Sequence, residues 1–156
     1  MKNPLSPKKN SAKKQAQDFI LDASVALSWY FKDEANAYAD SVAAACATSN
    51  IIVPSLWFLE IANIIVMGER RGRSTVAQAA TWLGFLESLP IITDEAPASG
   101  TCNNIINLAR SYELSAYDAA YLELALRRSL PLATLDKKLR AAAKAAGITL
   151  YMSHVG

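Results

Sequence analysis

The sequence predicts an α/β fold, a three-layer α/β/α sandwich around a mostly parallel sheet, and three observations support that prediction. Short apolar runs recur between turn signals. Longer Ala- and Leu-rich segments with helical periodicity separate these runs. Residues that favour helix ends stand at the boundaries. Because strands joined by helical crossovers form a parallel sheet with helices on both faces, the alternation indicates this architecture.

Each element follows from its own local pattern. Five strands are expected, at Phe19–Leu21, Ile51–Val53, Leu89–Thr93, Leu130–Thr134 and Ile148–Tyr151. Helical segments are expected to run from Asp33 to Ser49, from Ser55 to Arg71 and from Ser74 to Ser88, with Gly147 closing the last one.

Size and composition favour a single domain. The chain has 156 residues, of which 52% are hydrophobic, enough for one sizeable core. The net charge of +2 includes five lysines among the first 17 residues, so that residues 18–156 carry −3. We expect residues 1–17 to be a basic, disordered leader and residues 18–153 to be the folded domain.

Several classes of protein are excluded by what the sequence lacks. No apolar run approaches the roughly 18 residues that span a bilayer, and the polar start does not resemble a signal peptide. Cys46 and Cys102 have no metal-ligand spacing and are expected to stay reduced. A cytoplasmic protein with no membrane association is therefore expected.

Two carboxylates follow predicted strands. Asp22 interrupts the apolar stretch DFILDASVALSWYF after the first strand, and Asp136 follows the fourth. Because ligands of such sheets bind beyond the carboxyl ends of the strands, both side chains belong to the edge where a site is expected. Each residue also precedes a helical segment, so that a role as helix N-cap is an equal alternative.

Two further carboxylates lie on helices. Asp118 fits the S-x-x-D capping box that begins at Ser115. Glu60 and Asn63 are the only polar residues between Ser55 and Gly68, on a helix that is apolar on nearly every side and therefore predicted to be buried. The alternative for Glu60 is a buried side chain hydrogen-bonded to Asn63, its neighbour on the same face.

Together the four carboxylates predict a cation site. Asp22, Glu60 and Asp136 follow the first, second and fourth strands, and carboxylates gathered in one cleft repel unless a cation neutralises them. Oxygen ligands without His or Cys select Mg²⁺ or Mn²⁺. His154 is the only histidine, which argues against a zinc site or a His-based triad. Such clusters are typical of phosphodiester hydrolysis, whereas an aspartyl-nucleophile phosphatase would need a second Asp where Ser24 stands.

The ordered set of motifs resembles the PIN-domain ribonucleases, and within them the VapC-type toxins of toxin–antitoxin pairs. The motifs are D-A-S at Asp22–Ser24, E-x-x-N at Glu60–Asn63, D-A-A-Y at Asp118–Tyr121 and T-x-D at Thr134–Asp136. The resemblance covers residues 18–153, although the leader precedes its usual start and the stretch from Asp94 to Thr101 matches no motif.

The resemblance implies a five-stranded sheet in the order 3-2-1-4-5 and an endoribonuclease that depends on Mg²⁺ or Mn²⁺. It also implies a homodimer silenced by an antitoxin protein. By the resemblance, Asp22 and Asp118 bind the metal, Glu60 binds it directly or through water and orients the nucleophile, and Asp136 completes the site. Ser24, Asn63 and Thr134 correspond to its supporting polar positions.

RNA needs basic residues beside such an acidic site. The candidates are Arg70, Arg71, Arg73, Arg127, Arg128, Lys137, Lys138 and Arg140. Lys137 and Lys138 are favoured because they adjoin Asp136, while helix C-termini alone would explain the others. Two alternatives stay open: a catalytically silent PIN-like module that binds RNA or protein, and a housekeeping RNA-processing nuclease.

Overall fold

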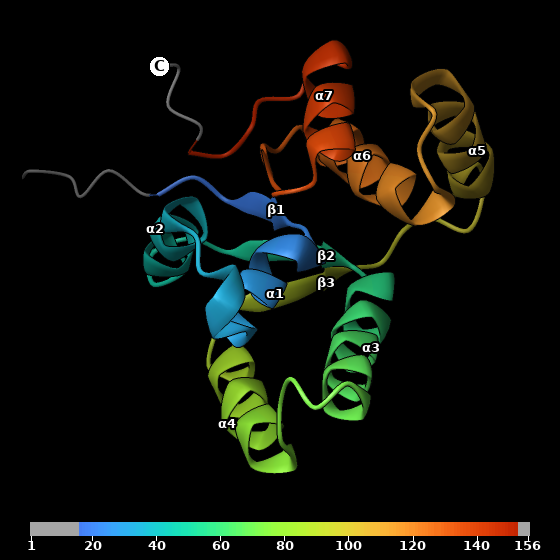
Figure 1. Ribbon diagram of the computed structural model, residues 1–156. Helices are drawn as coiled ribbons and strands as arrows, with labels where there is room; N and C mark the ends of the chain where they lie inside the picture. Colours follow the sequence, from blue (N-terminus) through green and yellow to red (C-terminus); the bar gives the residue numbers. More distant parts are fainter. Residues whose placement is uncertain (1–15, 153–156) are drawn as a thin grey trace, which may run out of the picture.

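Four parallel strands form the central sheet of the computed structural model, which describes residues 16–152 (Figure 1). They are β1 (Phe19–Leu21), β2 (Ile51–Pro54), β3 (Ile91–Asp94) and β4 (Leu132–Ala133). The order is β3-β2-β1-β4, with Phe19 opposite Ile51 and Ile20 opposite Leu132. The predicted α/β class and its parallel sheet are thus confirmed.

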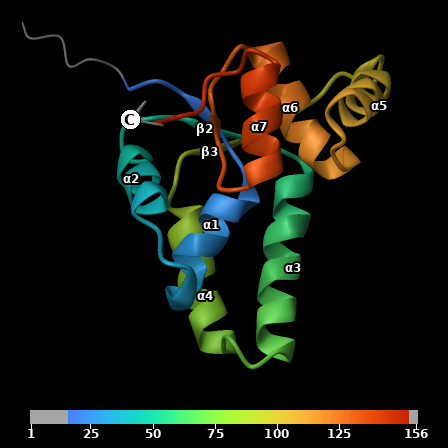
Figure 2. The ribbon, with the colours of Figure 1, turned by 45° about the horizontal axis from the view of Figure 1, so that its top comes forward.

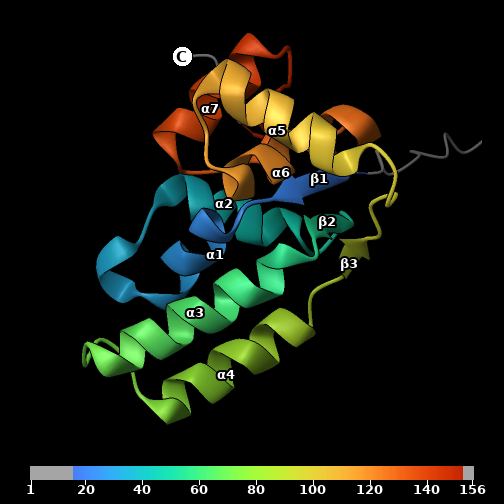
Figure 3. The ribbon, with the colours of Figure 1, turned by 90° about the vertical axis from the view of Figure 1, so that its right-hand side faces the viewer.

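Helices cover both faces of the sheet (Figures 1 and 3). One face carries α1 (Ala23–Tyr30), α2 (Ala37–Ala45), α3 (Leu56–Arg70) and α4 (Val76–Glu87), with a 3₁₀ turn, η1 (Lys32–Glu34), after α1. The other face carries α5 (Thr101–Tyr112), α6 (Ala116–Arg128) and α7 (Lys137–Ala145). The chain moves from β1 through β2 to β3 at one edge of the sheet and then returns to β4 on the other side of β1. Because the crossovers are right-handed, the helices before β3 and those after it cover opposite faces of the sheet. The direction reverses between β1 and β4, which is where a site is expected.

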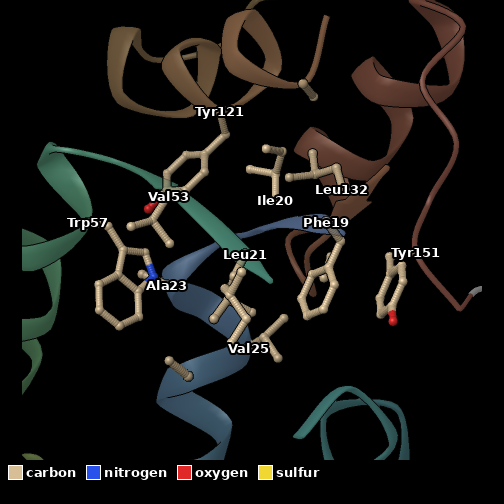
Figure 4. Packing of buried hydrophobic residues seen from close by; sticks show 14 of the residues in the cluster. Phe19, Ile20, Leu21, Ala23, Val25, Val53, Trp57, Tyr121, Leu132 and Tyr151 are labelled. Carbon is tan, nitrogen blue, oxygen red and sulfur yellow. The ribbon is translucent and has the colours of Figure 1, made fainter. Parts of the chain in front are cut away.

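The core lies between the two helical layers. Phe19, Ile20 and Leu21 of β1 are fully buried, as expected of a central strand covered on both faces. The ring of Tyr151 stacks on Phe19 with 4.0 Å between centroids, and Trp57 and Tyr121 are the largest fully buried side chains (Figure 4). Each such side chain contributes roughly 1.5–3 kcal/mol on burial.

The predicted fifth strand is reduced to a single bridge, and the predicted count of five is corrected to four within the described residues. Leu150 pairs in parallel with Leu132, beside β4 as the predicted order requires. Gly147 and Met152 both have positive φ, at 79° and 51°, so the extended segment between them is too short to propagate a ladder.

Two helix starts also differ from the prediction. The second helix begins after Asn36, whose Oδ1 accepts the amides of Tyr38 and Ala39, and Asp33 instead belongs to η1. Helix α4 begins after Thr75, which forms a reciprocal capping box with Gln78, one residue beyond the predicted Ser74. In both places a side chain that satisfies free amides decides the boundary.

Helix α3 is more exposed than predicted. Its buried residues are Trp57, Ile61 and Gly68, whereas Phe58 and Leu59 are 51% and 75% exposed. The reason is its position, because α3 and α4 extend away from the sheet and only part of each helix packs on the domain (Figures 2 and 3). The prediction of burial on nearly every side was therefore wrong.

The remaining sequence expectations touch the ends of the chain. The predicted leader, apart from its last two residues, and His154 lie outside the described residues. Between residues 16 and 152 no helix has the length and apolar character needed to cross a membrane.

Candidate active site

Asp22 stands where β1 ends and α1 begins. Its amide donates to the carbonyl of Ala133 at 3.0 Å, which fixes it against β4, and its side chain is buried. It occupies the N-cap position of α1 but caps no amide. Instead its Oδ2 accepts the hydroxyls of Ser24 at 2.5 Å and Thr134 at 2.7 Å. The helix-cap alternative for Asp22 is therefore wrong.

The same two hydroxyls hold the segment that carries Asp136. Thr134 Oγ1 accepts the amide of Asp136 at 3.0 Å, and Ser24 Oγ accepts the amide of Leu135 at 3.0 Å. Each hydroxyl thus donates to Asp22 and accepts from the β4–α7 connection. Asp22 Oδ1 accepts no hydrogen bond within residues 16–152, which leaves one oxygen of the pair uncommitted.

Asp136 and Asp118 both lie near the start of a helix. Asp136 Oδ1 accepts the amide of Leu139 at 2.7 Å, so its predicted alternative as the N-cap of α7 is confirmed. Asp118 lies in the first turn of α6, where Ser115 Oγ accepts its amide at 3.1 Å. Ser115 thus caps α6, but no hydrogen bond from the Ser115 amide to the Asp118 carboxylate completes the predicted capping box. Both carboxylates belong to the site, because both line the cavity described below.

Glu60 has a different partner from the one expected. Tyr121 on α6 donates its hydroxyl to Glu60 Oε1 at 2.5 Å, and no bond joins Glu60 to Asn63. Tyr121 is fully buried, so this contact ties α3 to α6 across the end of the sheet. Sequence reasoning assigned Tyr121 no role. The available signal was its position three residues after Asp118, on the same face of the helix.

The four carboxylates line one cavity of about 270 Å³. Its lining comes from the start of α1, from the second and third turns of α3, from the first turn of α6 and from the β4–α7 connection. Figure 2 shows these elements next to one another. Its lining consists of Asp22, Ala23, Ser24, Leu27, Glu60, Asn63, Ile64, Asp118 and Asp136. Thr134 lies behind this wall, fully buried. The sequence thus identified the acidic residues that converge, although they come from distant segments.

Burial and mutual repulsion raise the pKa values of three carboxyl groups in the cavity. Burial raises the pKa of Asp22, and the charges of Asp118 and Asp136 raise it further against the lowering effect of Ser24 and Thr134. Burial also raises the pKa of Glu60 to about 7, with smaller contributions from Asp22 and Asp118. The pKa of Asp118 is raised by burial and by Asp136. None of the four forms an ion pair with a basic side chain of the described residues.

The donor set suits a hard divalent cation. No three Asp, Glu, His or Cys side chains within residues 16–152 already converge into a complete metal site. Mg²⁺ does not require one, because it keeps several waters and is bound through one or two carboxylates together with substrate phosphate. All-oxygen donors, mutual repulsion and the lack of any ion pair to the four carboxylates within residues 16–152 fit Mg²⁺ or Mn²⁺, with Asp22 and Asp118 as the residues that would hold it.

Most of the basic candidates are already committed. Arg73 pairs with Asp33 and Glu34, Arg127 and Arg128 pair with Asp94, Lys138 donates to the Glu113 carbonyl, and Arg140 donates to the Thr134 carbonyl. Asp94, in the stretch without a motif, thus has a structural role. The side chains of Arg70, Arg71 and Lys137 form no hydrogen bond or ion pair within the described part of the chain. Lys138 is still near enough to lower the pKa of Asp118.

Comparisons with protein families and with solved structures agree with each other. Residues 19–145 match the PIN domain. The chain is similar to the crystal structure of PAE2754 from Pyrobaculum aerophilum, with 25% identity, a TM-score of 0.61 and coverage of 81% of this chain and 86% of that chain. It is also similar in fold to FitAcB from Neisseria gonorrhoeae, with 15% identity, a TM-score of 0.58 and coverage of 85% and 95%. A search of curated proteins gives no match.

Proposed function

The chain belongs to the PIN-domain family, and we propose that it is a metal-dependent endoribonuclease acting as the toxin of a toxin–antitoxin pair. PIN domains are typically metal-dependent nucleases. The observation that carries the proposal is the one cavity that Asp22, Glu60, Asp118 and Asp136 line together, with no ion pair to any of them within residues 16–152. An acidic cavity of this kind stabilises a divalent ion and the phosphate that the ion attracts.

Each residue has a defined part in the proposed reaction. When bound, the metal would polarise the scissile phosphate and acidify an attacking water. Asp22 and Asp118 would hold it, and Ser24 and Thr134 keep Asp22 in place. Glu60 lines the same cavity, where its carboxylate would take a proton from the water, and Tyr121 orients that carboxylate. Asp136 and Asn63 complete the polar wall.

The partners follow from the same proposal. RNA is the substrate, an antitoxin protein covers the acidic cavity, and both act in the cytoplasm. A homodimer is supported by apolar side chains left exposed on α3 and α4, notably Leu59 at 75% and Val76 at 74%. Exposed large apolar residues that gather on neighbouring elements mark protein interfaces.

The direct test is cleavage of RNA by the purified full-length chain. With Mg²⁺ or Mn²⁺ present, the unmodified chain should cut a single-stranded RNA internally, and EDTA should stop the reaction. Asp22→Asn and Asp118→Asn should each reduce the rate at least a hundredfold while leaving circular dichroism unchanged. Asp40, an exposed residue of α2, does not line the cavity, so that Asp40→Asn is the matched control and should cut normally.

The remaining outcomes separate the alternatives. RNA binding without cleavage under any divalent ion would identify a silent binding module. Cleavage without growth arrest on expression in cells would identify a housekeeping nuclease. Undiminished cleavage by Asp22→Asn would refute the proposed site.

A further inference from the structure

A second hollow continues from the acidic cavity. It has a volume of about 400 Å³ and is lined by Leu27, Phe31, Asn63, Ile64, Met67, Gly68, Arg71 and Arg73. Leu27, Asn63 and Ile64 line both hollows. The two hollows therefore adjoin each other beside α1 and α3, which pack against each other (Figure 2). The second hollow together with the acidic cavity is called the groove below.

One face of α3 forms a wall of this groove. Glu60, Asn63, Ile64 and Met67 follow one another at intervals of one or three residues and form a stripe along α3. Arg71, the C-cap residue directly after the helix, continues this stripe four residues beyond Met67. At 100° per residue, Arg71 returns to within about 20° of Glu60, whereas Arg70 lies about 80° away. The rise along the axis places Arg71 about 16 Å from Glu60.

The floor of the groove is tightly packed. The guanidinium of Arg73 lies 3.9 Å from the centroid of the Phe31 ring, and a Cβ added at Gly68 would stand 2.8 Å from Phe31 Cζ. Leu27, Ile64 and Met67 are half-buried and leave an apolar surface. The groove is thus formed in advance, with no carboxylate in its lining beyond the acidic cavity.

Only one uncommitted cation lines the groove. Arg73 Nη2 binds Asp33 at 3.1 Å and Glu34 at 2.8 Å, so its charge is balanced. The side chain of Arg71 is exposed and forms no hydrogen bond or ion pair within residues 16–152, although its amide donates to the Met67 carbonyl at the end of the helix. Arg70 is equally exposed and equally free, but it does not line the groove.

We propose that this groove holds the single-stranded RNA that adjoins the cleaved bond, with Arg71 bound to a phosphate a few nucleotides away. The proposal rests on the proposed function. It adds a substrate-binding residue, Arg71, and the path of the RNA along the groove. An anionic strand entering an acidic cavity needs a cation beyond it, and Arg71 supplies that charge on the same helical face as Glu60. The apolar floor accommodates a ribose or a base between the two charged ends.

The test measures RNA binding in EDTA, where cleavage does not occur. The probe is a fluorescein-labelled single-stranded RNA, and anisotropy gives the affinity of the full-length chain at a series of salt concentrations. Arg71→Ala should weaken binding several-fold at low salt and reduce the slope of log K against log salt by roughly 0.7, the value for one lost phosphate contact on a single strand. Arg70→Ala is the matched control and should leave the slope unchanged. Arg71→Lys should retain it.

Strand length provides a second readout. The effect of Arg71→Ala should disappear for oligonucleotides too short to span about 16 Å from Glu60. Equal effects of Arg70→Ala and Arg71→Ala, or no effect of either, would overturn the proposal. So would an Arg71→Ala chain that binds RNA normally but loses a protein that co-purifies with the unmodified chain, since the groove would then hold a protein segment. None of these results depends on whether the chain cleaves RNA.

Discussion

Glu60→Gln should make the stability of the metal-free protein less dependent on pH. Burial, aided by the charges of Asp22 and Asp118, raises the pKa of Glu60 from 4.5 to about 7. The folded state therefore holds this proton more tightly than the unfolded chain does. The stabilisation is complete below pH 4.5 and is lost as the pH rises through 7. Gln keeps an oxygen that accepts the Tyr121 hydroxyl and has no proton to lose.

The size of the effect follows from that pKa. Each pH unit between 4.5 and 7 is worth about 1.4 kcal/mol, so the loss would approach roughly 3 kcal/mol for a carboxylate fully shielded from solvent. Glu60 is only half-buried, and solvent screening reduces the expected loss to about 1–2 kcal/mol.

Urea unfolding in EDTA at pH 5 and pH 8 measures this quantity. The free energy of unfolding of the unmodified chain, minus that of Glu60→Gln, should fall by about 1–2 kcal/mol between the two conditions. Asp22 and Asp118 titrate in both proteins and largely cancel in the difference. Glu69→Gln, on the same helix but outside the cavity lining, should show no such change. A difference that is independent of pH would refute the reasoning.

Three further changes test other parts of the structure. Asp22→Asn should raise the urea midpoint in EDTA at pH 8, although it abolishes cleavage, because it removes a buried charge; a lower midpoint would contradict this account. Thr134→Val should cost about 1–3 kcal/mol in urea unfolding by removing a buried hydrogen bond to Asp22, and an unchanged free energy would argue against the bond. Gly68→Ala should lower the melting temperature because the added Cβ would meet Phe31. Gly84→Ala, which has open space and a helical backbone, should raise the free energy of unfolding by about 0.5–1 kcal/mol. The reverse order of melting temperatures would contradict the packing at Gly68.

The fold was largely predictable because its inner strands are short, apolar and buried. Apolar runs such as Phe19–Leu21 and Ile51–Val53 give a clear signal when both faces of a sheet are covered. The reduction of the predicted fifth strand to one bridge could not be foreseen, because it depends on the positive φ of Met152, which ends the pairing that Leu150 begins. The exposure of α3 was missed for a related reason, because an apolar helix surface does not reveal whether the domain itself covers it.

The site was predictable in its carboxylates but not in their contacts. Strand ends and helix starts brought Asp22, Asp118 and Asp136 to one edge of the sheet. The alternative of a hydrogen bond between Glu60 and its neighbour Asn63 was wrong, because Tyr121 of another helix donates the hydrogen bond to Glu60. Cap signals also could not distinguish Asp136, which caps its helix, from Asp22, which does not. Such differences depend on tertiary contacts that spacing along the chain does not encode.

The paired hydroxyls at Asp22 have a consequence for ion selectivity. With Oδ2 occupied by Ser24 and Thr134, this carboxylate presents a monodentate ligand. Calcium commonly draws both oxygens of a carboxylate, and doing so here would require breaking those bonds. A smaller ion that retains its water shell needs only the remaining oxygen. In the proposed metal site, the two hydroxyls would therefore disfavour the larger cation.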